Sequence, residues 1–242
     1  MLPGFGSLAL ITLLLGNAPP NGSPGSYVTT YTRTPAGIRE ISTKAYVPQP
    51  GDIVLYDDHK LHWKILYNVA GTEPPDHSGI VILNKDGTPA ILESGPNNGR
   101  YVEILDWHPR LTNFAGTTYI RRLKTPLTRE QSAQLTEFAY AQEGKRYATG
   151  RLMLQMTPFR CRGSLRKKFF GCTNLSRNRW LCSELVVAAG TVVGLFDPKQ
   201  HPANAIYPRD IIFDHYYDLS DTWHLAGVWS PAPPKIRQEG QK

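Results

Sequence analysis

The chain has 242 residues, of which 40% are hydrophobic and 19% charged, as in an ordinary globular domain. This length supports one domain with a sizeable core, and the absence of any fixed sequence period excludes solenoids and propellers. The net charge is +7. Seven basic residues and no acidic ones lie from Arg160 to Arg179, so the rest of the chain is close to neutral.

The N-terminus carries an apolar run, residues 7–15, which has the length of a signal-peptide core and is too short to cross a bilayer. No lysine or arginine precedes it, which is untypical of a signal peptide. Small and turn-forming residues follow at 16–26 and indicate a linker. We therefore expect residues 1–26 to be a signal segment with a linker, and the protein to be exported to a periplasm or out of the cell. Without a functional signal it would be cytoplasmic.

Apolar and β-branched segments dominate the first half of the remaining chain and predict strands. These segments are residues 51–56, 77–83, 90–93, 101–105 and 117–123. Lys85-Asp86-Gly87 separates two of them and predicts a hairpin with a three-residue loop.

Two helices follow with a different period. Thr128 and Gln131 predict a capping box, residues 135–142 place apolar side chains on one helical face, and Gly144 predicts the helix end. A second segment, apolar nearly all round, begins at Cys182. Its valines fit a strand as well, but its alanines and leucine favour a helix. The order of elements predicts an α+β fold in which a mostly antiparallel sheet packs against helices.

The chain has three cysteines, Cys161, Cys172 and Cys182. An odd number in an exported protein suggests one disulfide and one free thiol. Cys161 and Cys172 could close a short loop around basic residues, which would leave Cys182 free. In a reducing compartment all three would be thiols.

Two residues fit nucleophilic catalysis. Cys182 would begin a buried helix, where unpaired backbone N–H groups favour a thiolate and stabilise an oxyanion; the alternative is a small core residue. His77 is one of seven histidines and opens a buried strand. Its small neighbours Ser78 and Gly79 would leave room for a substrate or a partner side chain. The alternative is a histidine that is satisfied at a strand end.

The hairpin decides whether Glu93 can orient His77. With the three-residue loop, Gly79 faces Glu93, and both share a face with His77. Glu93 is then one diagonal step from His77, about 7 Å between backbones. A two-residue Asp86-Gly87 loop would send Glu93 to the opposite face. Because an unpaired buried carboxylate is costly, Glu93 needs a partner in its apolar strand.

Four segments, taken in this order, resemble the permuted NlpC-type papain-like amidohydrolases, most closely their YiiX/YaeF-like branch. They are Asp52-Ile53-Val54-Leu55, His77-Ser78-Gly79-Ile80-Val81-Ile82, Leu92-Glu93-Ser94-Gly95 and Trp180-Leu181-Cys182-Ser183-Glu184-Leu185-Val186. Gly144-Lys145-Arg146-Tyr147 resembles the Gly-x-Pro-Tyr element of the wider superfamily, with Arg146 in place of the proline.

The resemblance spans about residues 50–215 and implies a circularly permuted papain-like fold. It implies Cys182 as the nucleophile, His77 as the base and Glu93 as the orienting group, with Tyr147 lining the pocket. It also implies hydrolysis of an amide or peptide bond, often in cell-wall peptides, without a metal or cofactor. One alternative is a lipid-directed acyltransferase or thioesterase on the same triad, and a second is a non-catalytic binding protein on this fold.

We expect the catalytic domain to span residues 27–229, with a basic insertion at 157–180, and residues 230–242 to form a disordered tail. The basic residues of the insertion fit a solvated loop or contact with an anionic lipid or cell-wall surface. Binding of single-stranded nucleic acid by these cations and nearby aromatic residues is the least favoured interpretation.

Two further groups of residues have an open role. Residues 57–62, Asp57-Asp58-His59-Lys60-Leu61-His62, hold metal-ligand types, but nothing elsewhere in the sequence completes a site, so we favour a solvated turn. Arg121 and Arg122 could reach a substrate carboxylate or could equally lie at the surface.

Overall fold

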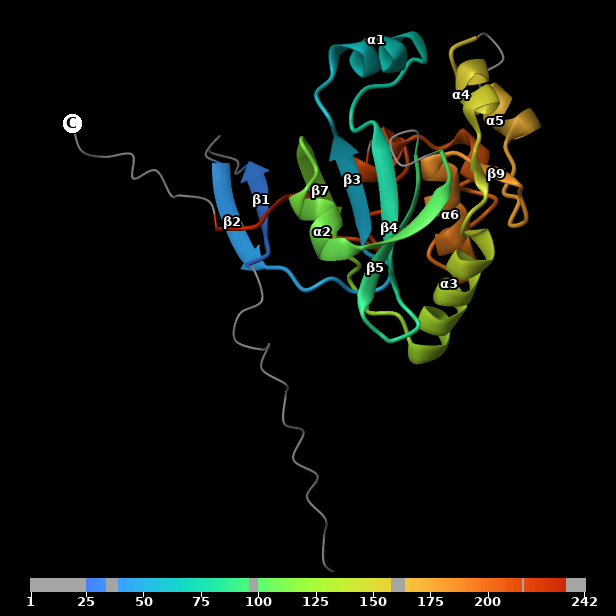
Figure 1. The fold of residues 1–242 in the computed structure, drawn as a ribbon. Coiled ribbons are helices and arrows are strands. Elements are labelled where there is room, and N and C mark those ends of the chain that lie inside the picture. The colour runs from blue at the N-terminus through green and yellow to red at the C-terminus, as the bar shows by residue number, and fades with distance from the viewer. Residues whose placement is uncertain (1–24, 34–38, 96–99, 158–163, 215, 234–242) are drawn as a thin grey trace, which may run out of the picture.

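The structure is a computed structural model that describes residues 25–33, 39–95, 100–157, 164–214 and 216–233. Eight strands form one antiparallel sheet in the order β2-β1-β10-β7-β3-β4-β5-β6, and helices lie along it (Figure 1). The strands are β1 (Tyr27–Arg33), β2 (Arg39–Ala45), β3 (Ile53–Asp57), β4 (His77–Leu83), β5 (Pro89–Ser94), β6 (Val102–Asp106), β7 (Thr117–Arg121) and β10 (Gly227–Ser230).

The helices differ greatly in length and burial. They are α1 (Leu61–Val69), α2 (Trp107–Thr112), α3 (Arg129–Gln142), α4 (Thr149–Gln155), α5 (Ser164–Phe170), α6 (Cys182–Val192), α7 (Pro208–Ile212) and the short 3-10 helix η1 (Ala203–Ala205). β8 (Arg146–Tyr147) and β9 (Arg179–Trp180) form a separate parallel pair. Among the described residues, none of these helices combines the length and hydropathy needed to span a membrane.

The predicted α+β class and antiparallel sheet are confirmed, and each of the five predicted strands is present. The expected order of strands first and helices second is wrong at the chain ends. β10 returns from the C-terminal part to lie between β1 and β7. Its sequence, Gly-Val-Trp-Ser, is too short and too rich in small residues to give a strand pattern.

The predicted hairpin register is also confirmed. The Asn84 N–H donates to the Thr88 carbonyl at 2.7 Å, and Gly87 closes the three-residue loop with a φ of +83°, which a glycine adopts without strain. Gly79 consequently faces Glu93 across β4 and β5.

Alternating side chains of the strands build a core on each face of the sheet. One core joins residues such as Ile53 and Ile80 to α3 and α6, and the other joins residues such as Val54 and Val81 to Leu111 of α2. The predicted capping box starts α3, and α6 is buried from Cys182 through Gly190. Since a buried aliphatic side chain contributes about 1.5–3 kcal/mol, these contacts hold α6 firmly against the strands.

Candidate active site

Cys182 is the first residue of α6, and the chain before it is fixed by neighbouring elements. Trp180 is fully buried, and its indole N–H donates to Gln142 Oε1 at 3.2 Å. The carbonyl of Trp180 accepts the Ala148 N–H at 2.9 Å. These contacts fix the point at which the chain enters the helix, so the Cys182 side chain starts from a well-defined position and is only 5% exposed.

A buried carboxylate holds one side of the His77 ring. His77 Nε2 lies 3.2 Å from Glu93 Oε2, and Arg110 Nε donates to Glu93 Oε1 at 2.7 Å. Burial raises the pKa of Glu93, but the charges and hydrogen bonds of His77 and Arg110 outweigh it and hold the pKa below its ordinary value. The carboxylate therefore stays charged between two cationic partners.

On its other side the imidazole lies close enough to Cys182 for that side chain to raise the pKa of His77. Because Nε2 faces Glu93, the nitrogen left for the sulfur is Nδ1. Burial lowers the pKa of His77, but the Glu93 charge and the hydrogen bonds with Cys182 and Glu93 raise it from 6.5 to about 10. His77 is therefore an imidazolium at neutral pH.

A glycine allows this contact across the end of the sheet. Glu93 and His77 point to the sheet face covered by α2, whereas α6 packs on the other face. Extending the β4–β5 register by two residues places Gly95 opposite His77. A Cβ at Gly95 would lie 2.9 Å from His77 Cε1 and 3.4 Å from both ring nitrogens. The ring therefore lies over the bare backbone of Gly95, in space that any side chain at this position would occupy.

Aromatic residues and α4 enclose the sulfur. Tyr56 stacks on His77 with ring centroids 5.4 Å apart. The pocket beside Cys182 has a cavity volume of about 30 Å³. It is lined by Tyr67, Ala70, Tyr147, Leu152, Gln155, Met156, Leu181, Cys182, Ser183, Tyr207 and Pro208. The pocket is thus narrow and mostly apolar or aromatic, and Tyr147 lies in its wall as the resemblance implied.

Two carboxyl groups lie next to His77 in the fold. Burial and the neighbouring Asp58 carboxylate raise the pKa of Asp76 from 3.8 to about 7, so Asp76 and Asp58 share a proton below neutral pH. One oxygen of Asp57, of Asp58 and of Asp76 all lie within 4.8 Å of one another. Asp76 is thus a third carboxylate beside the two of residues 57–62. Because Lys60 Nζ already pairs with Asp58 at 3.2 Å, we assign no metal to this cluster.

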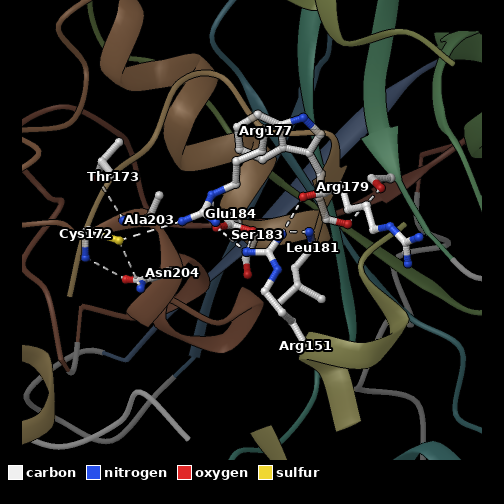
Figure 2. A network of polar contacts seen from close by, with 12 residues as sticks. Arg151, Cys172, Thr173, Arg177, Arg179, Leu181, Ser183, Glu184, Ala203 and Asn204 are labelled. Carbon is white, nitrogen blue, oxygen red and sulfur yellow. Dashed lines mark hydrogen bonds and ion pairs between the residues drawn. The ribbon is translucent and has the colours of Figure 1, made fainter. Parts of the chain in front are cut away.

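An ion-pair network fixes the first turn of α6 (Figure 2). Glu184 is buried, and its carboxylate lies 2.6 Å from Arg151 Nη1 and 2.9 Å from Arg177 Nε. The same carboxylate accepts the Leu181 N–H at 3.4 Å. Arg177, although part of the basic segment, is therefore a structural contact of the helix that carries Cys182.

The remaining predicted site residues lie away from the pocket. Ser78 and Gly79 are buried inside β4 and do not line it, and a Cβ at Gly79 would meet Ile91 Cγ2 at 2.6 Å, so packing fills the space expected for substrate. Cys172 is exposed, and its sulfur accepts a hydrogen bond from Asn204 Nδ2 at 3.3 Å. Cys161 lies outside the described residues, so its pairing with Cys172 stays a prediction.

Sequence reasoning missed Arg110, Gly95 and Asp76. Arg110 is distant in sequence from the other site residues, and no local pattern marks it as the partner of Glu93. Gly95 could have been found, because the predicted hairpin register, continued by two residues, already places it opposite His77. Asp76 directly precedes His77, but its pairing with Asp58 depends on how the chain between β3 and β4 folds back.

No protein-family profile matches the chain, and no curated protein matches it. Among solved structures, the crystal structure of the metalloprotein YiiX from Escherichia coli O157:H7 is similar to it. The two share 18% sequence identity with a TM-score of 0.44, over 62% of this chain and 69% of YiiX. The architecture and site geometry described above rest on this chain's own residues.

Proposed function

We propose that this chain is a cysteine hydrolase of the permuted papain-like, NlpC-type kind, acting on an amide or peptide bond through a thioester. One observation carries the proposal: the His77 imidazole lies 3.2 Å from the Glu93 carboxylate and close enough to Cys182 for that side chain to raise the pKa of His77. A nucleophile, a base and an orienting group in hydrogen-bonded series are what thiol acyl chemistry requires. The chain order of histidine, acid and cysteine fits the permuted arrangement.

The proposed reaction starts from an imidazolium beside a thiolate. A charged His77 next to the sulfur stabilises the thiolate, which attacks the substrate carbonyl carbon. The oxyanion that forms accepts the backbone N–H of Cys182, one of the unpaired donors at the start of α6. His77 then gives its proton to the leaving amine as the carbon–nitrogen bond breaks. His77 then takes a proton from water, the resulting hydroxide attacks the thioester carbon, and the Cys182 thiolate leaves, which restores the thiolate–imidazolium pair.

A second candidate, an acyl-directed thioesterase or acyltransferase on the same triad, is favoured by the pocket lining. Leu152, Met156 and Leu181 line the pocket with several aromatic residues, and no charged side chain is among the lining residues that the structure describes. An apolar wall binds an acyl chain better than a charged peptide. Both candidates form the same thioester on Cys182. They differ in the part of the substrate that binds the pocket wall, a peptide or an acyl chain, and in the molecule that finally accepts the acyl group.

Mass spectrometry after exposure to matched activated esters tests both candidates. One ester carries a dipeptide acyl group and the other an octanoyl group, and the Cys172→Ser background limits labelling to the remaining thiols. We expect acylation of Cys182 that disappears in His77→Ala. Acylation that is unchanged by that substitution would contradict both catalytic candidates, and so would a Cys182 that is inert to both esters and to iodoacetamide at neutral pH. The remaining interpretation would be a non-catalytic binding protein. Faster acylation by the octanoyl ester would select the second candidate.

A further inference from the structure

A second cavity lies at the other end of the sheet from the pocket at Cys182. It has a volume of about 270 Å³ and opens between β1, β2, the end of β7 and the chain before β10. No residue lines both cavities, and in Figure 1 β1 and β2 lie on the opposite side of β3 and β4 from α4 and α5. A ligand in this cavity would not touch Cys182.

Three basic side chains, Lys44, Arg122 and His224, converge on this cavity. Among the residues that the structure describes, no carboxylate lies within ion-pair distance of any of them. Burial together with the positive charges of Lys124, Arg122 and Lys44 lowers the pKa of His224. His224 is therefore neutral at neutral pH, and Lys44 and Arg122 supply the positive charge of the cavity. Two uncompensated cations in a concave site attract an anion.

The Arg122 guanidinium is positioned by the fold but has an unused donor. The His224 N–H donates to the Arg122 carbonyl at 2.8 Å, which ties the two chain segments together, and the guanidinium lies over the Tyr46 ring at 5.8 Å. Its Nε is buried and has no hydrogen-bond partner among the described residues. A buried donor without a partner costs free energy, which a bound acceptor would recover.

The rest of the cavity wall is apolar. Val28, Ile120 and Leu225 line it beside the basic groups. Gly227 of β10 packs directly against Val28 of this wall, and a Cβ at Gly227 would lie only 2.4 Å from Val28 Cγ1. The site thus combines the planar Arg122 guanidinium, which can bind a carboxylate or phosphate, with an apolar wall that can bind a hydrocarbon group.

We propose that this cavity binds a small organic anion, a carboxylate or phosphate ester with an apolar body, at a site separate from the pocket at Cys182. The inference is independent of the proposed function, because it uses none of the residues around the thiol. Arg122 would take the anionic group, Lys44 would add charge, and the apolar wall would take the body of the ligand.

Isothermal titration of the full chain with hexanoate, hexyl phosphate, hexanol and hexylamine tests this proposal. We expect one equivalent of each anion to bind, more weakly as salt is added, and neither hexanol nor hexylamine to bind comparably. Arg122→Gln and the exposed-site variant Lys44→Gln should each weaken anion binding about tenfold, which is about 1.4 kcal/mol. Arg129→Gln, which removes an exposed arginine on α3, is the matched control and should bind as the original chain does.

Alkylation separates this site from the active site. Binding should persist after iodoacetamide has blocked Cys182, and the tighter of the two anions identifies the preferred group. Loss of binding on alkylation would place the ligand at Cys182 and overturn the proposal. So would no binding of either anion, equal binding of hexanol, or unchanged binding in both Arg122→Gln and Lys44→Gln.

Discussion

At the scale of single residues, the state of His77 is set by what surrounds its ring. Desolvation alone would favour a neutral imidazole, but the buried Glu93 carboxylate 3.2 Å away outweighs that effect. Arg110 in turn holds Glu93 charged. Arg110, Glu93 and His77 thus form a row of alternating charges that keeps the imidazole protonated beside Cys182. Each of these residues can be substituted separately.

Glu93→Gln should lower the pKa of His77 from about 10 toward its ordinary value, because the substitution removes the charge that raises it. Iodoacetamide labelling of Cys182 at pH 7 should slow by about 100-fold, since positioned acid–base groups contribute on this order. NMR titration of His77 and labelling kinetics measure the two effects. Glu130→Gln, on the exposed start of α3, is the control. An unchanged His77 pKa would contradict the role given to Glu93.

Gly95→Ala should displace the His77 ring, since the new Cβ would lie 2.9 Å from Cε1. Misplacement of a catalytic group by about an ångström costs about tenfold or more in rate, and the free energy of unfolding should fall by about 1–3 kcal/mol because the buried site is overpacked. Labelling kinetics and urea denaturation report the two quantities separately. Gly150→Ala, where a Cβ meets nothing within 4 Å, is the matched control. Unaltered labelling would show that the ring does not depend on this gap.

At the scale of elements, the start of α6 is held by charge as well as by packing. Glu184 lies in the first turn, where a carboxylate also suits the helix dipole, and it joins α6 to Arg151 of α4 and to Arg177. α4 has no buried residue of its own, so this ion pair is one of the contacts that keep it beside the pocket. The wall next to Cys182 therefore depends on the same carboxylate as the helix.

Glu184→Gln should destabilise the protein by about 3 kcal/mol, because it leaves two partly buried arginines without their counter-charge. Urea denaturation monitored by tryptophan fluorescence measures this loss. Glu143→Gln, an exposed change at the end of α3, should leave the midpoint in place. A Glu184→Gln midpoint equal to that of the control would mean that packing alone fixes the first turn.

At the scale of the whole molecule, several buried groups make stability depend on pH in opposite directions. Burial raises the pKa of Asp52 from 3.8 to about 6, and burial with Asp58 raises that of Asp76 to about 7. Both favour the folded state while protonated, so their stabilisation is complete below about pH 4 and is lost as the pH rises through 6 and 7. Glu93, with a lowered pKa, stabilises above its unfolded pKa and loses this effect as the pH falls.

We therefore expect the free energy of unfolding to fall in two steps as the pH rises. The first step, for Asp52 and Asp76, runs from about pH 4 to 7, and the second, for His77, runs from about 6.5 to about 10, where His77 loses the proton that pairs it with Glu93. Urea unfolding at a series of pH values measures the profile. Asp76→Asn should reduce the first step and leave the second. A profile flat from pH 5 to 8 would contradict the raised pKa values.

The sequence by itself determined strands β3 to β7, the two long helices and the hairpin register, because these depend on local periodicity, on a capping box and on one glycine that adopts a positive φ. The register in turn placed Glu93 beside His77 before any tertiary contact was known. Such features are local, so neighbouring residues specify them.

Only the tertiary structure decided which distant groups complete the site. Arg110 reaches Glu93, Asp76 meets Asp58, and Arg177 pairs with Glu184, each through a fold-back of the chain that no local pattern encodes. The C-terminal strand β10 and the cationic cavity beside it have the same origin, since strands far apart in sequence form them. Packing of the whole chain, with its long-range burial and charge, selects these contacts.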